Sequence, residues 1–420
     1  MSVADFNLIA PETLECPYPF YEALHAEAPV HFVPELGMAV VSTYELLSEV
    51  VHDPITYSSS IPTGPADLVM QQDENVDEEL KMLRETTNRA SAPTLLAADP
   101  PYHMRYRSLV NKALSARRVA SMEGYVREIV TGLIDEFIDD GKVDFTKQFA
   151  DEVPMAVIAD QIGVPRKDLK DYKARADAAI GGIERQIPPE EERSILKAGL
   201  ELQEYFLMRA QEAREDPKDN IITTLATVEM DHPDDGKRPL NDAEILSILQ
   251  QLQVAGKETT AHCIGSTMLL FIENPDELTK VQDDPSLITN MVEETLRVET
   301  PVRALFRRTT KPVTLGGVDL PEGQLMMLIY AAANRDECQF ADAAQFDVGR
   351  ENAREQMAFS AGPHYCVGAA LARLEIRVAF EEVVKRMTNF RLDPDHPAPT
   401  HQPSYILRGL NNLHILFDKA

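Results

Sequence analysis

The chain has 420 residues, of which 44% are hydrophobic, and a formal net charge of −28 at pH 7. A chain of this length and apolar share can bury a large core, and we expect one domain over residues 1–420. The negative charge argues against nucleic acid as a partner, because such binding depends on basic contacts to phosphate. No apolar run approaches the roughly 20 residues that cross a bilayer, so we expect no membrane partner and a soluble, cytoplasmic protein.

Most of the chain shows helical spacing of its apolar residues, with short β-rich runs in between. These runs lie at residues 28–42, 313–330 and 403–417. Pro34 and Gly37 break the first run and predict a hairpin, and the last run also predicts a hairpin. Residues 119–140 and 195–214 predict amphipathic helices. We therefore expect a mainly α fold with small β-sheets.

A long helix is predicted from Asn241 to about Glu273. Asn241 is a suitable N-cap, Glu244 follows three residues later, and Asn274-Pro275 ends the pattern. This segment is apolar on most sides, so it should run through the middle of the molecule.

The centre of the long helix reads AGKETT, residues 255–260. Ala255 and Gly256 remove side-chain bulk where a large group could lie against the backbone. Glu258 and Thr259 place an acid and a hydroxyl in the helix interior, where threonine can open the backbone ladder and leave room for a water or a small ligand. An ordinary helix with one weak turn, in which Glu258 and His262 form an i, i+4 pair, explains the same residues.

Glu294 and Arg297 share one face of a further predicted helix at i, i+3 spacing. Such pairs are common on protein surfaces. They could form a buried network with Arg350, which ends the turn-rich run 331–350, only if the fold brings these residues together.

Four cysteines are scattered through the chain, at Cys16, Cys263, Cys338 and Cys366. No CxxC pair is present, so we expect neither a zinc site nor a redox pair. Cys366 stands out because an apolar helical pattern begins directly after it. Backbone N–H groups and the helix dipole at that position stabilise a thiolate.

The segment FSAGPHYCVGAALAR, residues 359–373, surrounds this cysteine. Gly362 and Gly368 permit tight turns, and Phe359 supplies an apolar neighbour for the sulfur. The thiolate could be a catalytic nucleophile with His364 as its base, a metal ligand, or a buried cysteine without a role. Zinc would need a second pair of ligands, which leaves one thiolate bound to haem iron as the remaining metal option.

The same segment resembles the haem-binding signature of the cytochrome P450 monooxygenases, especially the soluble bacterial ones. Further family landmarks follow in the expected order over nearly the whole chain. They are DPPYH at 99–103, AGKETT at 255–260, Glu294 with Arg297, and ANRD at 333–336. Ser360 departs from the family, which usually has glycine there, and Ala361 follows it. We expect these two residues to alter the loop backbone or its tuning of the iron while the ligand remains.

The resemblance implies a single-domain P450 fold with a long central helix over haem b. Cys366 would be the axial ligand of the haem iron, and Glu294, Arg297 and Arg350 a structural network behind the cysteine. The basic residues that match propionate-binding positions are His103, Arg107, Arg307 and His364. The other matching cofactor-contact positions are Ala255, Gly256, Phe359, Gly362 and Gly368.

The resemblance also assigns proton delivery to dioxygen to Glu258 and Thr259. Peroxide-using relatives tend to lack this pair, so the implied function is a dioxygen-dependent hydroxylation. Two alternatives from other classes stay open. One is a haem-binding sensor or carrier, and the other is a haem-thiolate isomerase or dehydratase that does not oxygenate its substrate.

Electrons would come from a ferredoxin and its reductase. Residues 102–120 carry five basic residues and no acid, in a strongly acidic chain: Arg105, Arg107, Lys112, Arg117 and Arg118. In the family this face lies nearest the thiolate, so we expect an acidic ferredoxin to dock there. A solvated helix face with Arg107 on the haem is the alternative.

The substrate pocket, by family position, would be mostly aliphatic. Its expected residues are Gln251, Val254, Ala255, Thr259, Val302, Leu305, Ile406 and Leu407. They indicate an apolar small molecule, such as an aromatic, terpenoid or steroid-like compound, with a polar contact from Gln251. Residues 57–97 and 176–193 are expected to form mobile lids.

Overall fold

The computed structural model describes residues 2–34, 36–61, 77–89, 92–180, 188–232 and 236–420. The chain divides into two compact units. Unit 1 is Met1–Ser58, Ala116–Pro154 and Lys257–Ala420, and unit 2 is Ser59–Ser115 and Met155–Gly256. The expectation of one domain over residues 1–420 stays a prediction. Parts of both expected lids, residues 62–76, 90–91 and 181–187, lie outside the described residues.

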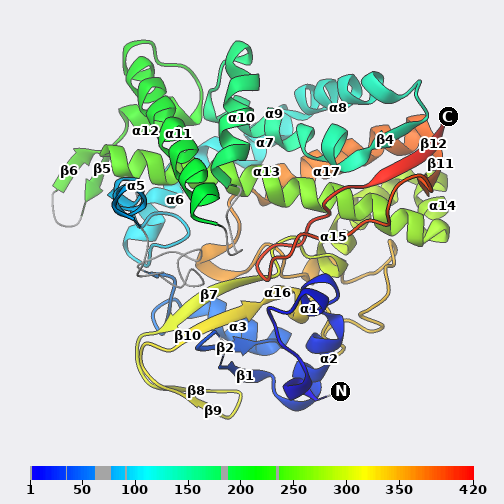
Figure 1. Cartoon of the computed structure of the whole chain (residues 1–420), viewed down its shortest axis with the longest axis horizontal. Coiled ribbons are helices and arrows are strands. Elements are labelled where there is room, and N and C mark those ends of the chain that lie inside the picture. The colour runs from blue at the N-terminus through cyan, green and yellow to red at the C-terminus, as the bar shows by residue number, and fades with distance from the viewer. Residues whose placement is uncertain (1, 35, 62–76, 90–91, 181–187, 233–235) are drawn as a thin grey trace. The chain divides into compact units, whose positions relative to one another are not determined.

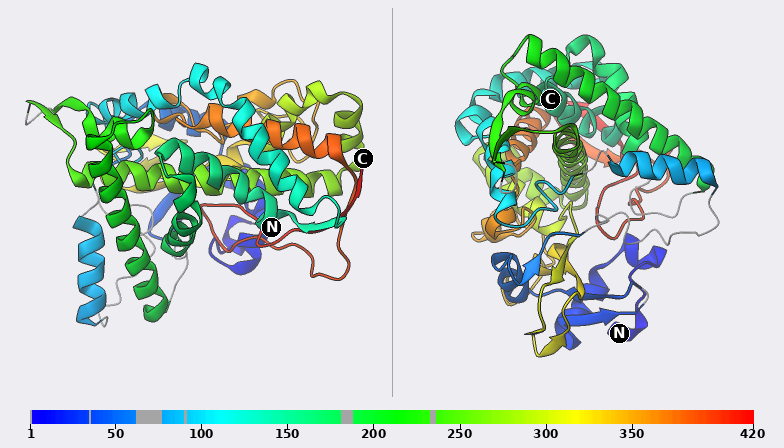
Figure 2. Two further views of the ribbon diagram at one scale, coloured as in Figure 1. Left: turned by 90° about the horizontal axis from the view of Figure 1, so that it is seen from above. Right: turned by 90° about the vertical axis from the view of Figure 1, so that its left-hand side faces the viewer.

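A five-stranded sheet organises unit 1, in the order β1-β2-β10-β7-β3. Its strands are β1 (Val30–Val33), β2 (Met38–Val41), β3 (Tyr57–Ser58), β7 (Ala304–Thr309) and β10 (Leu325–Ile329). The blue β1 and β2 and the yellow β7 and β10 lie side by side in Figures 1 and 2. The antiparallel pairing of β1 with β2 confirms the first predicted hairpin, and Gly37 lies in its turn with a φ of 62°.

The helices of unit 1 surround this sheet and a second, three-stranded one. The helices are α1 (Pro11–Glu15), α2 (Tyr18–Glu27), α3 (Tyr44–His52), α7 (Ala116–Ser121), α8 (Glu123–Phe137), α14 (Pro275–Asp283), α15 (Ile288–Val298), α16 (Tyr330–Ala333) and α17 (Ala369–Arg386). The second sheet has the order β11-β12-β4, with β4 (Lys142–Asp144), β11 (Met387–Leu392) and β12 (His414–Lys419). The strands β8 (Val313–Leu315) and β9 (Val318–Leu320) form a separate pair.

The last predicted hairpin is present only in part, as an isolated antiparallel bridge between His401 and Leu410, beside which Gln402 N donates to Gly409 O at 2.9 Å. Only β12 forms a strand there, and residues 404–410 form an irregular loop. The backbone of this loop bonds elsewhere: Ile406 O accepts from Arg303 N at 2.6 Å, and Arg408 N donates to Pro301 O at 2.9 Å. Two loop amides, those of Ile406 and Leu407, donate to the Ser404 hydroxyl.

The core of unit 1 lies between the five-stranded sheet and α3. Ala39, Val41 and Leu328 of the sheet pack in one buried cluster with Leu47 and Val50 of α3. The end of α3 is thereby fixed on the sheet. This matters for the site, because the segment that carries Cys366 rests on that end.

Unit 2 is largely helical. Its helices are α5 (Glu78–Arg89), α6 (Tyr102–Ala113), α10 (Leu169–Ile180), α11 (Pro189–Glu215) and α12 (Ile221–Thr227), with one strand pair, β5 (Glu229–His232) and β6 (Gly236–Pro239). α10 packs along α11 (Figure 1). Arg84 of α5 forms two hydrogen bonds to Glu192 of α11, at 2.6 and 2.8 Å, so the described part of the first expected lid is a helix bonded to its neighbour.

Two helices continue from one unit into the other, α9 (Glu152–Ile162) and α13 (Asp242–Glu273). α13 is the predicted long helix. Glu244 N donates to the Asn241 side chain at 2.9 Å, and Asn241 N donates to the Glu244 carboxylate at 2.7 Å. These reciprocal bonds are the capping box that the sequence predicts.

Over the described ranges, every helix is too short or too polar to span a bilayer.

Candidate functional site

The segment Met357–Gly368, called here the cysteine loop, presents Cys366 at the start of α17. Cys366 N donates to Phe359 O at 2.9 Å, which closes the loop, and Ser360 N donates to Met357 O at 2.8 Å. Cys366 is exposed, and α17 begins three residues later, at Ala369. This geometry confirms the predicted position of the sulfur near a helix N-terminus.

The two glycines of the cysteine loop have different roles. Gly362 has a φ of 65°, and a Cβ at this position would lie 2.4 Å from the backbone oxygen of Val51 at the end of α3. No other residue fits there without displacing backbone. At Gly368 a Cβ would contact only the Cys366 sulfur, at 3.9 Å, so steric fit alone does not require glycine.

Ser360 adopts a φ of 57°, in the left-handed region that non-glycine residues rarely enter. Its hydroxyl lies 3.1 Å from the hydroxyl of the buried Tyr330, the first residue of α16. Ala361 is extended, with a φ of −144°. Ser360 is therefore the unusual residue of the pair, and a specific hydrogen bond accompanies its conformation.

Asn334, directly after α16, joins the cysteine loop to the core. Its side-chain oxygen accepts from Met357 N at 2.6 Å, and its side-chain nitrogen donates to the Thr300 hydroxyl at 2.8 Å. Its backbone oxygen accepts from Arg297 at 2.9 Å. Asn334 belongs to the ANRD landmark, but spacing gave no sign of what it binds.

Glu294 and Arg297 form a fully buried, bidentate pair, with both bonds at 2.8 Å. Arg350 Nε donates to Glu294 at 3.0 Å, so the structure brings together all three members of the predicted network. Arg297 also donates to the backbone oxygens of Ala343 and Gln345. Burial lowers the pKa of Arg297, opposed by its bonds to Glu294. Their burial excludes the alternative that Glu294 and Arg297 form an ordinary pair on the protein surface.

A second acidic residue of α15, Glu293, is linked to the cysteine loop through Arg373. Arg373 of α17 binds Glu293 through two bonds, at 2.6 and 3.0 Å. The guanidinium carbon of Arg373 lies 4.5 Å from the centre of the Phe359 ring, and Arg373 Nη1 donates to the Tyr365 hydroxyl at 3.0 Å. The sequence analysis missed Glu293 and assigned no role to Arg373, although both lie beside motif residues.

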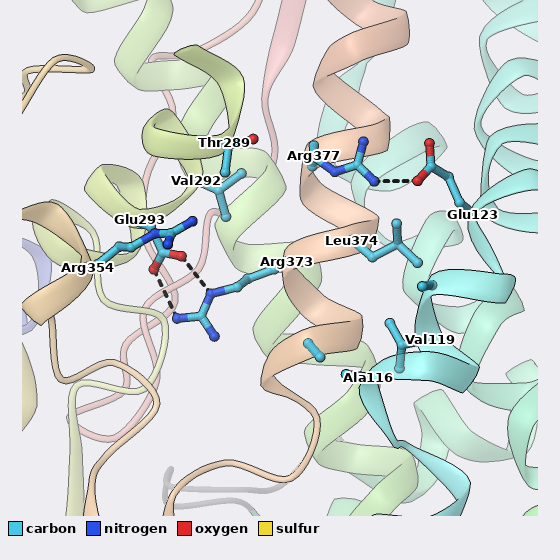
Figure 3. A pocket seen from close by; sticks show the side chains of 12 residues that line it. Ala116, Val119, Glu123, Thr289, Val292, Glu293, Arg354, Arg373, Leu374 and Arg377 are labelled. Atoms are coloured by element: carbon cyan, nitrogen blue, oxygen red, sulfur yellow. Dashed lines mark hydrogen bonds and ion pairs between the residues drawn. The ribbon is translucent and has the colours of Figure 1, made fainter. Parts of the chain in front are cut away.

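Arg373 also lines a cavity of about 300 Å³ between α7, the start of α8, α15 and α17 (Figure 3). Val119, Val292 and Leu374 supply apolar walls. The charged residues around it are Glu123, Glu293, Arg354, Arg373 and Arg377. The sequence analysis did not identify this cavity, because its lining comes from four separate parts of the chain.

The centre of α13 is less buried than the residues around it. Ala255 is exposed and Val254, Glu258 and Thr259 are half-buried, whereas Leu252, Gln253 and residues 260–268 are buried. The side chains of Glu258 and Thr259 are thus partly accessible within an otherwise buried helix. The predicted place for a ligand at AGKETT agrees with this pattern.

Gly256 has a packing role. A Cβ there would lie 2.8 Å from Ile158 of α9, so glycine is required where the two helices meet. His262, which the alternative interpretation of AGKETT pairs with Glu258, is buried, and its ring packs against Gly409, where a Cβ would lie 2.3 Å from Nε2. Burial lowers the pKa of His262 to about 4.

The side chain of Gln251 forms hydrogen bonds with three other residues of the chain. Its amide nitrogen donates to the hydroxyls of Thr94 at 2.7 Å and Ser247 at 2.9 Å, and its amide oxygen accepts from Leu96 N at 2.8 Å. The side chain that sequence reasoning assigned to substrate therefore anchors residues 94–96 to α13.

The remaining predicted pocket residues of unit 1 divide into two groups. Val302 and Leu407 pair in an isolated β-bridge, and both are half-buried. Ile406 is buried, and Leu305 packs against the core beneath the sheet.

Of the predicted propionate-binding residues, Arg307 and His364 lie in unit 1. Arg307 is buried on β7, and His364 ends a short turn before Cys366. His103 and Arg107 lie on α6 of unit 2. Their contact with a cofactor stays a prediction.

The donor set fits haem. Cys366 offers one accessible sulfur, with two basic side chains, Arg307 and His364, in the same unit. Within the described ranges, no group of three or more His, Cys, Asp or Glu residues could hold a metal ion. An iron bound here must therefore bring its other ligands with it, as the iron of haem does.

Comparison with known proteins supports the same conclusion. The family model for cytochrome P450 matches residues 66–415. A putative cytochrome P450 123 of Mycobacterium tuberculosis is 31% identical over 404 residues, covering 96% of this chain and 94% of the relative. The vitamin D(3) 25-hydroxylase of Pseudonocardia autotrophica is 31% identical over 400 residues, covering 94% and 93%.

The solved structure of cytochrome P450 CYP109Q5 from Chondromyces apiculatus matches with a TM-score of 0.85 and 29% identity, covering 100% of this chain and 99% of the other. The expected fold, cofactor and enzyme class are thereby confirmed. The chain belongs to the cytochrome P450 family of monooxygenases, which bind haem b.

Proposed function

We propose that the protein is a dioxygen-dependent monooxygenase that hydroxylates an apolar small molecule with electrons from a ferredoxin and its reductase. The observation that carries this proposal is the partly accessible Glu258-Thr259 pair at the centre of the buried α13. Haem, when bound to the Cys366 thiolate, supplies the redox chemistry that cleaves dioxygen and oxidises a C–H bond.

The protein's own residues supply a ligand, anchoring charges and protons. The Cys366 sulfur would bind the iron, and Arg307 and His364 would bind the propionates, the role also predicted for His103 and Arg107. Thr259 Oγ1 holds a proton toward dioxygen, and the Glu258 carboxyl group replaces it. The half-buried Val302 and Leu407 favour an apolar substrate. The relative named for vitamin D(3) agrees with a steroid-like or terpenoid compound.

The electron donor is proposed to dock over the cavity beside α7 and α17. Arg373 lines that cavity (Figure 3). It also contacts Phe359 and the Tyr365 hydroxyl, two residues of the cysteine loop. Arg354 and Arg377 lie around the cavity, and the exposed Arg117 lies on α7. Glu123 and Glu293 also line the cavity and balance part of this positive charge, and the remaining excess close to the cysteine suits a small acidic protein. Arg105 of α6 instead donates to Asp231 O.

The spectrum of the reduced carbon monoxide complex tests the iron ligand. A strongly red-shifted Soret band is expected for the wild type and not for Cys366→His. Haem that binds without this band would contradict thiolate ligation.

Turnover separates a monooxygenase from a haem sensor or an isomerase. With ferredoxin, reductase and NADH, the wild type should consume NADH and form a hydroxylated product. Thr259→Ala should divert electrons to peroxide, while Thr260→Ala, which removes a neighbouring buried hydroxyl, should stay coupled. Full coupling in Thr259→Ala would refute the proton-delivery role.

The docking surface is tested by charge reversal. Arg117→Glu with Arg118→Glu should slow reduction by ferredoxin at low salt, and salt should reduce the difference. Arg391→Glu, an exposed position on β11, is the control. Equal rates for both variants would exclude this surface.

A further inference from the structure

Two arginines of unit 1 contact one carboxylate, that of Glu299, and a third, Arg303, lies within electrostatic reach of it. Arg408 Nε donates to one oxygen of Glu299, and the Tyr18 hydroxyl donates to the other. Arg335 Nη2 lies 3.7 Å from Glu299, and its guanidinium carbon lies 3.6 Å from the centre of the Tyr18 ring. Because Arg303 interacts electrostatically with both Arg408 and Glu299, the three arginines and Glu299 are called here the arginine cluster.

The cluster carries more positive than negative charge. Three guanidinium groups and the Glu299 carboxylate leave a net charge of +2. Burial raises the pKa of Glu299, but Arg408 and Arg335 together with Tyr18 lower it to about 2, so this carboxylate is already ionised. The other acids near Arg408, Glu15 and Glu273, are exposed, and Glu15 pairs with His401 at 2.7 Å.

Among the three arginines, Arg303 has the fewest hydrogen bonds from its guanidinium group. Its side chain is 2% exposed, and Nη1 donates to Ser404 O at 2.9 Å. Its other donors, Nε and Nη2, have no hydrogen-bond partner among the described residues. These two N–H groups share one edge of the guanidinium plane, the edge that binds anions with two parallel bonds. The hydroxyl of the buried Tyr21 lies within electrostatic reach of both Arg303 and Arg408.

We propose that the arginine cluster binds one small monovalent inorganic anion, such as chloride, on the Nε and Nη2 edge of Arg303. A buried charge is retained in a protein when a counter-charge or hydrogen bonds compensate it. A halide supplies both to Arg303 and reduces the excess charge of the cluster. Burial at 2% exposure leaves no access for a large organic anion.

The bound anion would stabilise the contact between residues 301–303 and the loop 404–410. Arg303 N donates to Ile406 O, and Arg408 N donates to Pro301 O. Because the β-bridge of Val302 with Leu407 lies between these bonds, the anion should also strengthen substrate binding. This second effect rests on the proposed function, whereas anion binding itself does not.

The test uses the holoprotein at constant ionic strength, with sodium gluconate replaced stepwise by sodium chloride or bromide. Halide should stabilise the wild type in a saturable manner, multiplying the folded-to-unfolded ratio about elevenfold at ten times the Kd. Crystals in bromide should show an anomalous peak at Arg303.

Arg303→Met should abolish the halide-dependent part of the stability. Arg391→Met, which removes a half-exposed arginine 3.6 Å from Asp418, should keep it. Equal halide stabilisation of Arg303→Met and wild type, or bromide density only at other places, would overturn the proposal. If Arg303→Met does not fold, the bromide density of the wild type decides. Neither halide-dependent stability nor bromide density uses substrate turnover as its readout, so this test can fail separately from that of the proposed function.

Discussion

The hydroxyls of Ser360 and Tyr330 lie 3.1 Å apart, and their hydrogen bond joins the one left-handed serine of the cysteine loop to the first residue of α16. Serine in this conformation is strained, and glycine is not. The bond gives a physical reason why serine is tolerated at this position. It also makes the shape of the loop depend on a residue outside it.

Three variants separate strain from hydrogen bonding. Ser360→Ala keeps the strain and loses the bond, so it should destabilise the holoprotein by about 1–2 kcal/mol. Ser360→Gly loses the bond but relieves the strain and should be close to neutral, whereas Tyr330→Phe should resemble Ser360→Ala. Denaturant unfolding and the thiolate band of the carbon monoxide complex measure both effects.

The double variant is the internal control. Because Ser360→Ala and Tyr330→Phe remove the same bond, their combination should cost less than the sum of the single changes. Additive losses would show that the two hydroxyls act separately.

Gly362→Ala should prevent normal folding of the cysteine loop. The added Cβ would lie 2.4 Å from Val51 O, in a conformation that alanine avoids. Gly368→Ala, nine positions from Phe359 in the same motif, should fold because its Cβ contacts only sulfur, at 3.9 Å. Haem content per protein is the measurement, and equal haem content in the two variants would contradict this account.

Glu294→Gln should lower the free energy of unfolding by about 3–5 kcal/mol, because it leaves Arg297 and Arg350 buried without their counter-charge. The control is Glu78→Gln, which removes another i, i+3 pair, with Lys81, where both side chains are exposed. Glu78→Gln should change the free energy of unfolding by no more than about 0.5 kcal/mol. Urea unfolding of both variants provides the comparison, and similar losses would argue against a special role of burial.

Gln251→Leu should loosen residues 94–96 without unfolding the protein. Three hydrogen bonds disappear, including the one that protects the Leu96 amide. Hydrogen exchange at Leu96 should accelerate about tenfold if roughly 1.4 kcal/mol of local stability is lost. Gln250→Leu is the matched control, and unchanged exchange in Gln251→Leu would refute the anchoring role.

Glu299 should make stability depend on pH in the acid range. Its pKa of about 2 in the folded protein lies below the ordinary value of 4.5, so its contribution is complete above pH of about 5 and is lost as pH falls toward 2. The contribution should be about 3 kcal/mol. The free energy of unfolding of the wild type minus that of Glu299→Gln, measured from pH 7 downward, isolates it, and a difference independent of pH would exclude it.

Sequence reasoning succeeded where a local pattern decides the structure. The capping box at Asn241 and Glu244, the hairpin around Gly37 and the position of Cys366 before α17 all follow from short-range chemistry. The motif order also identified the partners Glu294, Arg297 and Arg350. Their burial could not be predicted, because it depends on the packing of α15 against distant parts of the chain.

It could not identify contacts between residues far apart in the sequence. Gln251 was assigned to substrate, a role that stays a prediction, and its bonds to Thr94 and Leu96 depend on a segment more than a hundred positions earlier. Gly256 was assigned to the cofactor, which also stays a prediction, and its contact with Ile158 could not be foreseen. Between His401 and Leu410 the expected hairpin is reduced to one isolated bridge, and part of its backbone bonds to residues 301–303.

Several residues that contact the cysteine loop come before it in the sequence. Val51, Tyr330 and Asn334, which hold its backbone and Ser360, all precede it. On a ribosome, which makes the N-terminal part first, these supports are therefore synthesised before the cysteine itself. The nascent chain can therefore form these three supports before the cysteine loop, whereas Arg373, which also contacts the loop, is made after it.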